Sequence, residues 1–297
     1  MAILAINPRL GTLQVAVSNG NYYETSTFPL PTIGDSMIEE TLLSWLEELE
    51  ISPSDLQQVI TSNREPELSA WLGSILHVPV QIMEPGQAAG CTQALVTGTP
   101  HLQRRCLADT YIFTHLAWAE AALRQLNAEE TNFIVVHLDE EHQFAALQGQ
   151  TVLDVLTSQD EGPFALRQSG ALPFDGVLDL CMEATNREEV LHTLHHEGGL
   201  AGYLGLADLE ELWFSTAEGS ALVREALIYQ IAKEIGALAT VLSGNVDGII
   251  LSGDLTKYKP FVESLSERID FIAPVSVHPG NQTLPALLAR SKVSSEE

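Results

Sequence analysis

The residue types that could do chemistry lie in a few short clusters along the chain. His192, His195 and His196 stand at helical spacing. Glu188 lies one turn earlier, so one helix face could hold a metal ion. We favour a simpler interpretation, in which the histidines end a helix just before Gly198-Gly199. A histidine at a helix C-terminus favours the helix dipole, and glycine is a common stop signal.

A second cluster is the acidic run Asp139-Glu140-Glu141. Three neighbouring carboxylates could bind a cation, but we favour a solvated turn. The three cysteines, Cys91, Cys106 and Cys181, are widely spaced and form no CxxC pair. They predict buried thiols in a reducing compartment, and they predict neither a disulfide framework nor a structural zinc site. The spacing alone supports no serine or cysteine catalytic triad.

Composition limits what these clusters could do. The chain has 297 residues, of which 45% are hydrophobic, enough for two ordinary cores. Its 40 acidic residues against 14 Lys plus Arg give a net charge of -26, which argues against nucleic acid and anionic membranes as partners. The N-terminus has no signal-peptide pattern, and no apolar run is long enough for a membrane span, so we expect a cytoplasmic protein.

The elements that must position these residues form a pattern that occurs twice. Short alternating apolar segments joined by tight turns predict a three-stranded antiparallel meander. The first copy covers residues 3–6, 13–17 and 22–27, and the second covers 133–138, 144–147 and 151–156. Helical spacing of apolar residues follows each copy, at 37–50 and at 177–182 with 187–196. The chain therefore reads as a duplication of one α/β unit, with a ligand cleft expected between the copies.

The remaining sequence predicts long helices and a parallel sheet. Residues 104–126 and 220–242 are apolar enough for two long helices. A strand at 248–251, a helix at 258–268 and a strand at 272–278 follow, an order that implies parallel pairing. We place the domains at 1–118 and 119–297, with a last helix near 284–297 that packs back on the first domain.

Several segments resemble those of the butyrate kinases, within the superfamily that joins acetate and sugar kinases to actin. The segments are 160–164, 169–173, 198–205, 229–236 and 271–275. The resemblance implies an α/β fold of two duplicated actin-like (ribonuclease-H-like) domains, each a mixed sheet with a meander and flanking helices.

The resemblance also implies a set of site residues. Those for nucleotide binding are Asn7, Thr12, Gly162 and Gly253, those for catalysis are Arg64 and Arg104, and no metal ligand is implied. Two of these positions have a second interpretation. The loop that contains Gly162 could be a ligand loop, although we favour a rigid turn, and Arg104 could instead pair with acidic side chains.

Much of the family's phosphate chemistry is altered in this sequence. The first phosphate turn, at residues 7–14, lacks the family's glycine after proline and ends in a glutamine where the family has lysine. The second turn is the acidic run 139–141, and Glu210 stands where the resemblance implies the transition-state arginine. Asn281 and Thr283 replace the acids implied for the metal. Phosphoryl transfer needs positive charge around the phosphates, so these changes disfavour catalysis.

Two hypotheses follow for function. The first is a scaffold or regulatory partner that keeps the kinase fold, with weak or absent catalysis and no cofactor. It would pair with itself or with an active kinase, through the helix at 220–242 or a nearby strand edge. The second is an active enzyme that uses ATP and Mg²⁺ to phosphorylate butyrate or another short-chain carboxylate. We favour the first.

Overall fold

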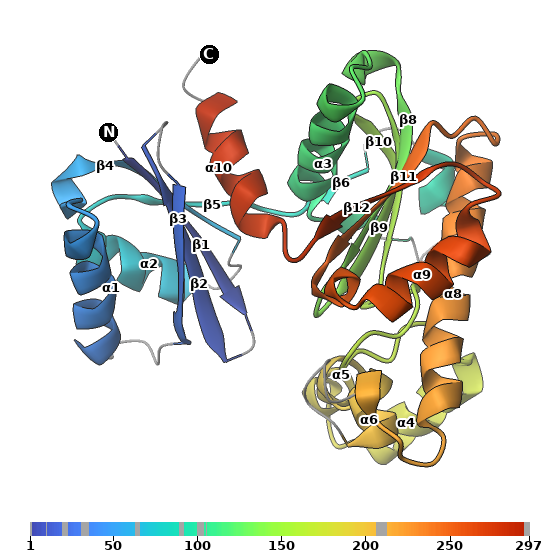
Figure 1. Cartoon of the computed structure of the whole chain (residues 1–297). Helices are drawn as coiled ribbons and strands as arrows, with labels where there is room; N and C mark the ends of the chain where they lie inside the picture. The colour runs from blue at the N-terminus through green and yellow to red at the C-terminus, as the bar shows by residue number, and fades with distance from the viewer. Residues whose placement is uncertain are drawn as a thin grey trace. The chain divides into compact units, whose positions relative to one another are not determined.

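The structure is a computed structural model that describes most of the chain. The described residues are 2–9, 11–19, 23–30, 36–62, 66–88, 92–99, 104, 106–205 and 213–293. The chain divides into two compact units (Figure 1). One unit comprises Met1–Pro85 with Gln282–Glu297, and the other comprises Gly86–Asn281.

The first unit is built on a five-stranded mixed sheet in the order β3-β2-β1-β4-β5. Its strands are β1 (Ala2–Arg9), β2 (Thr12–Ser18), β3 (Tyr23–Pro29), β4 (Leu56–Thr61) and β5 (Val80–Ile82). Its helices are α1 (Ser36–Glu48), α2 (Pro66–Leu76) and α10 (Thr283–Val293), with a short 3-10 turn η1 at Pro53–Asp55. Strands β1 to β3 form the predicted meander, and β4 runs parallel to β1.

The second unit repeats this sheet in the order β10-β9-β8-β11-β12. Its strands are β8 (Asn132–Leu138), β9 (His142–Gln148), β10 (Thr151–Thr157), β11 (Gly248–Gly253) and β12 (Val275–Pro279). Strands β8 and β12 both lie parallel to β11, and the meander β8-β9-β10 is antiparallel. The same order and the same strand directions in both sheets confirm the predicted duplication.

Helices complete the second unit. They are α3 (Thr110–Leu123), α4 (Phe174–Glu183), α5 (Arg187–His196), α6 (Gly199–Leu204), α8 (Ser220–Val241) and α9 (Lys259–Ile269). A small two-stranded sheet joins β6 (Gly86–Gln87) to β7 (Leu107–Ala108), and 3-10 turns lie at η2 (Thr92–Leu95), η3 (Ala128–Glu130) and η4 (Asp254–Lys257).

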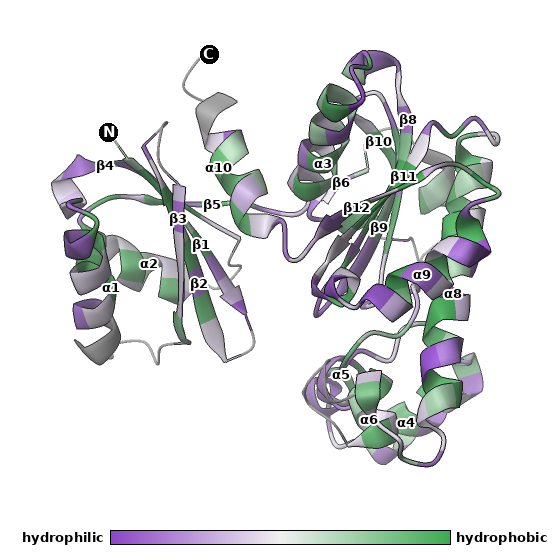
Figure 2. Cartoon of the chain, viewed as in Figure 1, coloured by the Kyte–Doolittle hydropathy of each residue, from purple (hydrophilic) through white to green (hydrophobic). Residues whose placement is uncertain are grey.

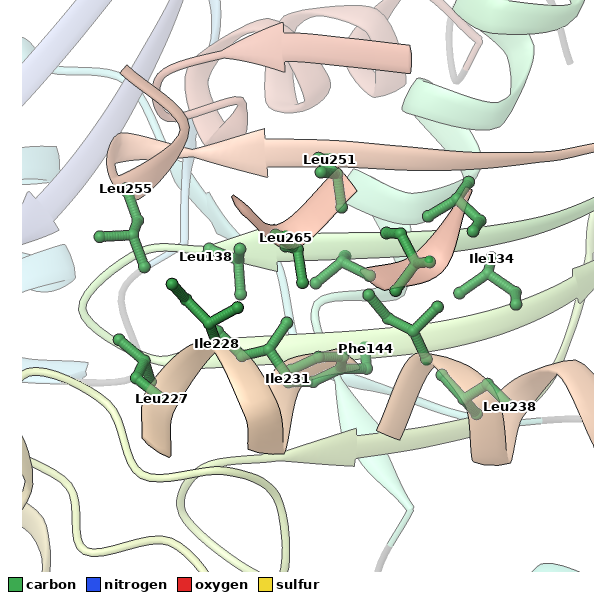
Figure 3. Close-up of a cluster of buried hydrophobic side chains, with 14 of the residues drawn as sticks. Ile134, Leu138, Phe144, Leu227, Ile228, Ile231, Leu238, Leu251, Leu255 and Leu265 are labelled. Atoms are coloured by element: carbon green, nitrogen blue, oxygen red, sulfur yellow. The ribbon is translucent and has the colours of Figure 1, made fainter. Parts of the chain in front are cut away.

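Helices α8 and α9 cover one face of the second sheet and form its core. Buried side chains of α8, among them Ile231 and Leu238, pack against Phe144 and Leu251 of the strands (Figure 3). Leu265 of α9 joins the same cluster. The apolar spacing in residues 220–242 therefore serves the core of this unit.

One predicted helix is wrong at its start. We expected a helix over 104–126, but α3 begins only at Thr110. Leu107 and Ala108 pair with β6 instead, and Cys106 has φ of +47°, which a right-handed helix cannot contain. Helix propensity in this stretch is overridden by strand pairing and by the contacts of Arg104 described below.

The described part of the chain contains no helix that is both long enough and apolar enough to cross a membrane.

Candidate functional site

The carboxyl ends of three parallel strands meet at one edge of the second sheet. His137 of β8 pairs in register with Ser252 of β11, and Ser252 pairs with His278 of β12. In open α/β sheets this edge is where ligands bind. The residues that follow each strand here, Asp139, Asp254 and Asn281, therefore define a candidate site.

Gly253 ends β11 in a conformation that only glycine adopts readily. Its φ is +96°, and a Cβ atom there would lie 2.3 Å from the carbonyl oxygen of Leu138. Its backbone N–H donates to the carbonyl of Gly280 at 2.9 Å and its carbonyl accepts from Gly280 N–H at 3.2 Å. The Thr256 hydroxyl also donates to the Gly253 carbonyl, at 2.7 Å. The turn predicted at Gly253 is thus a tightly packed junction of β8, β11 and the segment after β12.

A buried carboxylate lies beside this junction. Asp139 is 8% exposed and accepts a hydrogen bond from the side-chain amide of Asn281. His137 also lies close, with its Nε2 3.8 Å from Asp139 Oδ2. His137 Nδ1 in turn lies 2.9 Å from the Ser252 hydroxyl. The interpretation of residues 139–141 as a fully solvated turn is therefore wrong for Asp139, because its carboxylate is folded into the edge of the sheet.

A second carboxylate at this edge pairs with a lysine. Asp254 Oδ1 lies 2.7 Å from Lys257 Nζ, within the turn η4. The lysine side chain is 60% exposed, so water screens its charge and the ion pair stabilises the fold only modestly. Lys257 also lies near Gly280, where a Cβ would meet Lys257 Cε at 3.1 Å.

Arg104 contacts acidic side chains and backbone carbonyls within the second unit. Its guanidinium pairs with Glu161 and lies 3.4 Å from Asp154 Oδ1. It also donates to the carbonyls of Ala94 and Val155, both at 3.2 Å. Burial lowers the pKa of Arg104, but the two carboxylates outweigh that effect and raise it. These contacts match the alternative interpretation of Arg104 as a partner for acidic side chains.

Gly162 lies in a turn that the chain's own backbone fills. Its N–H donates to Thr157 O at 2.8 Å, and its carbonyl accepts from Ala171 N–H at 3.0 Å. Gly170 has φ of +64°, and a Cβ there would lie 2.5 Å from the Phe164 nitrogen. Such close backbone contacts agree with the rigid-turn interpretation of this segment within the second unit.

The other nucleotide residues expected from the sequence belong to the first unit. Asn7 is buried, and its amide donates to Gln14 Oε1 at 3.2 Å and accepts from the Ser62 hydroxyl at 2.8 Å. Thr12 begins β2, opposite Arg9. Asn7 and Thr12 thus belong to the first unit, whereas Gly162 and Gly253 belong to the second. Some predicted positions lie outside the described residues. They are Arg64, the segment 206–210, which contains Glu210, and residues 100–103 and 105.

Helix α5 ends where the histidine pattern predicted. It stops at His196, with His195 and His196 in its last turn. Within the described ranges, no group of three or more His, Cys, Asp or Glu side chains is arranged to hold a metal ion. The position of the last turn of α5 confirms the predicted helix end at these histidines.

Comparison with known proteins identifies the family. The chain is 32% identical over 247 residues to the "Probable butyrate kinase 2" of Caldanaerobacter subterraneus subsp. tengcongensis, covering 80% of this chain and 70% of that protein. The chain belongs to the butyrate kinase family. It is also 29% identical over 269 residues to the "Probable butyrate kinase" of Thermotoga petrophila, covering 87% of this chain and 72% of that protein. No protein-family model matches.

Solved structures agree with this family on the level of the fold. The acetate kinase of Porphyromonas gingivalis has a TM-score of 0.74 at 14% identity, over the whole of both chains. The propionate kinase of Francisella tularensis subsp. tularensis has a TM-score of 0.75 at 12% identity, over 96% of this chain and 98% of that one. The predicted actin-like α/β fold class is confirmed.

The resemblance to the butyrate kinases implies that ATP phosphates and Mg²⁺ would bind at this edge of the second sheet. The residues there fit such a polyanion poorly. The polyanion would have to approach the buried Asp139 carboxylate, and two unit charges 4 Å apart repel by about 1 to 4 kcal/mol near a protein surface. Two cations of this unit, Arg104 and Lys257, already contact Glu161 and Asp254.

Sequence reasoning missed a buried polar cluster on the α3 face of the same sheet. Glu120 is 4% exposed and accepts hydrogen bonds from Arg124 Nε at 2.5 Å, Ser276 Oγ at 2.5 Å and His278 Nε2 at 2.9 Å. Burial alone would raise the pKa of Glu120, but these three donors outweigh burial and lower it. The available signal was a lone acid in an apolar helical stretch, four residues before an arginine.

Two further histidines, at separate places in the second unit, were also missed. His142 at the start of β9 is fully buried, and burial together with nearby His137 lowers the pKa of His142 to about 3. His115 of α3 also has a lowered pKa, because of burial and of His278 nearby. Both are therefore neutral at pH 7.

Proposed function

We propose that this member of the butyrate kinase family acts as a scaffold or regulatory partner, with weak or absent carboxylate kinase activity. The observation that carries the proposal is the buried Asp139 carboxylate at the strand edge, held by Asn281. This edge is where a family member would hold phosphates, and a fixed negative charge there opposes a polyanion.

The partner in this proposal is a second copy of the chain or an active kinase of the same family. A small carboxylate and ATP are the ligands that the kinase names of the relatives suggest. The acidic composition, with a net charge of -26, supports a protein partner over nucleic acid or an anionic membrane.

The first test is acyl-phosphate formation from butyrate and Mg-ATP, trapped as the hydroxamate, with an active butyrate kinase as positive control. We expect product either at the no-protein background or far below the rate of the positive control. Turnover at the rate of the positive control would contradict the proposal.

A second test isolates the carboxylate itself. Asp139→Asn removes one charge and leaves the side chain's shape, so we expect ATP to bind roughly 5-fold to several hundred-fold more tightly, by calorimetry. The matched control is Glu263→Gln, which removes one charge from an exposed ion pair with Lys259 on α9. Equal changes in ATP affinity in both variants would show that net charge acts, and not Asp139.

The second candidate function is an active ATP-dependent kinase that converts butyrate or another short-chain carboxylate to an acyl phosphate, with Mg²⁺. It is favoured by the Gly253 junction, whose backbone geometry is that of a tight glycine turn at the ligand edge of the sheet. The hydroxamate assay distinguishes the two candidates.

A further inference from the structure

A groove lies between helix α2 and strand β5 of the first unit. Its volume is about 440 Å³, and small-molecule sites commonly measure about 300 to 1,000 Å³. Ala70 and Gly73 of α2 line one side, and Val80 and Ile82 of β5 line the other. Hydrophobic residues are visible along α2 in Figure 2. The groove therefore offers an apolar surface of the size that a small ligand needs.

The groove contains a buried hydroxyl group without a partner. Ser69 lines the groove and is only 5% exposed. Across the described part of the chain, no group forms a hydrogen bond with its Oγ atom. Buried polar groups are nearly always paired, because an unpaired one loses its hydrogen bonds to water without replacement. A ligand that accepts a hydrogen bond from Ser69 would remove that cost.

Gly73 keeps space open between the helix and the strand. A Cβ atom at this position would lie 3.3 Å from Val78 O and 3.6 Å from Val80 Cγ2. Glycine in a helix interior is unfavourable, because it loses more backbone freedom on folding than alanine does. Since Gly73 lines the groove, any larger side chain here would reduce the space for a ligand.

The charges around the groove favour an anion. The chain has 40 acidic residues against 14 Lys plus Arg, yet none of the described residues that line the groove is Asp or Glu. His77 is the one residue in that lining whose side chain can carry a positive charge. Ser69 is the fourth residue of α2, at the end of the first turn, where the helix dipole favours negative charge. Glu67 of the same turn is exposed and does not line the groove, so an anion beside Ser69 is still favoured.

These features together define the chemistry of the ligand. We propose that the groove binds a short-chain aliphatic carboxylate, which accepts a hydrogen bond from Ser69 Oγ while its alkyl chain lies between α2 and β5. Ser69 and Gly73 lie on the same side of α2, about 6 Å apart along its axis, a span that an alkyl chain of about four to six carbons covers. The inference rests on the proposed function, because a regulatory protein of this family would use such a ligand to sense the supply of carboxylate.

Calorimetry of the full chain with butyrate and with hexanoate, in the absence of ATP, tests the proposal. We expect both to bind, and hexanoate to bind about 15-fold more tightly, because two more methylene groups are removed from water. Hexanamide has the same length without the charge and should bind several-fold more weakly than hexanoate. No binding of either carboxylate, or equal binding of hexanamide and hexanoate, overturns the proposal.

The variant Ser69→Ala separates ligand binding from a structural role. It should weaken hexanoate binding about ten- to a hundredfold, because a hydrogen bond to a charged group is lost. It should not lower the melting temperature of the unliganded protein, since the hydroxyl has no partner there. The matched control is Ser74→Ala, which removes an exposed hydroxyl of α2 that donates to Trp71 O outside the groove and should leave binding unchanged. Unchanged hexanoate binding in Ser69→Ala overturns the proposal.

The variant Ala70→Phe tests the groove by filling it. Ala70 is exposed on α2, so the larger side chain should leave the core of the unit in place and abolish hexanoate binding. Binding that survives in this variant would lie elsewhere on the chain, as at a kinase substrate site, and overturns the proposal. Neither measurement uses ATP or detects acyl phosphate, so failure of this proposal is distinct from failure of the proposed function, which the hydroxamate assay tests.

Discussion

Glu120 offers a sharp test of the contacts that fix the edge of the second sheet. The carboxylate is 4% exposed and joins α3 to β12 through donors from Arg124, Ser276 and His278. We expect Glu120→Ala to leave the Arg124 guanidinium without its main counter-charge. Removing one partner of a buried pair typically costs about 3 to 5 kcal/mol. Arg124 keeps hydrogen bonds to Asp247 O at 3.0 Å and Ser276 Oγ at 2.7 Å, which favours the lower end, about 3 kcal/mol.

The assay is urea unfolding at pH 7, followed by circular dichroism, with the free energy of unfolding compared between variants. The control is Glu225→Ala, because Glu225 pairs with Arg268 at 2.7 Å but both side chains are largely exposed. Such surface pairs contribute about 0 to 1 kcal/mol. A loss for Glu120→Ala within 1 kcal/mol of the control would refute the reasoning that the buried contacts stabilise this edge.

The same carboxylate has a pH signature. The pKa of Glu120 is lowered in the folded protein from its ordinary value of 4.5, so the unfolded chain takes up the proton first as the solution is acidified. Its contribution is therefore complete above about pH 4.5 and is lost as pH falls through the lowered folded pKa. Glu120→Gln should remove that part of the acid sensitivity while keeping the side chain's size.

Three further outcomes follow from the structure. Gly253→Ala should lower the free energy of unfolding in urea by more than about 2 kcal/mol, because the φ of Gly253 is +96° and the added Cβ would clash with a carbonyl. Gly244→Ala should lower it less, because Gly244 has φ of +76° but open space around its Cβ position. The pKa of His142 is about 3, so stability should fall between pH 6.5 and 3 as the unfolded histidine binds a proton first, and His142→Gln should flatten that fall. Arg104→Gln should lower the melting temperature more than Arg268→Gln, because Arg104 makes the more buried contacts.

The strands of both meanders could be predicted because alternating apolar residues and tight turns act locally. Predicted residues 133–138 became β8 (Asn132–Leu138), and 187–196 became α5 without change. Strand β4 (Leu56–Thr61) was missed because its sequence, LQQVIT, has a short apolar run without alternation. Its strand character depends on pairing with β1 and β5, which are distant in sequence.

The site was harder to predict than the fold, for a physical reason. A motif places a residue type at a position, but the neighbours of that side chain come from other segments. Asp139 was expected to be solvated, but it is buried and accepts a hydrogen bond from Asn281, which lies 142 residues later in the chain. Arg104 was expected either at a catalytic site or beside acids, and only the fold brings Asp154 and Glu161 to it. A turn at Gly253 could be predicted because glycine readily adopts a positive φ, whereas its expected part in nucleotide binding stays a prediction.

In both units the two faces of the sheet are covered in the same way. In each unit one face packs on two helices, α1 with α2 or α8 with α9, and the apolar residues of the strands point there. The opposite face carries one helix, α10 on β1 and α3 on β8, and there Asn7 and His137 lie near the strand ends. The polar residues near these strand ends are thus not members of the two-helix cores. The shared cores therefore do not fix which polar residues stand at the strand ends, so the fold by itself is weak support for kinase activity.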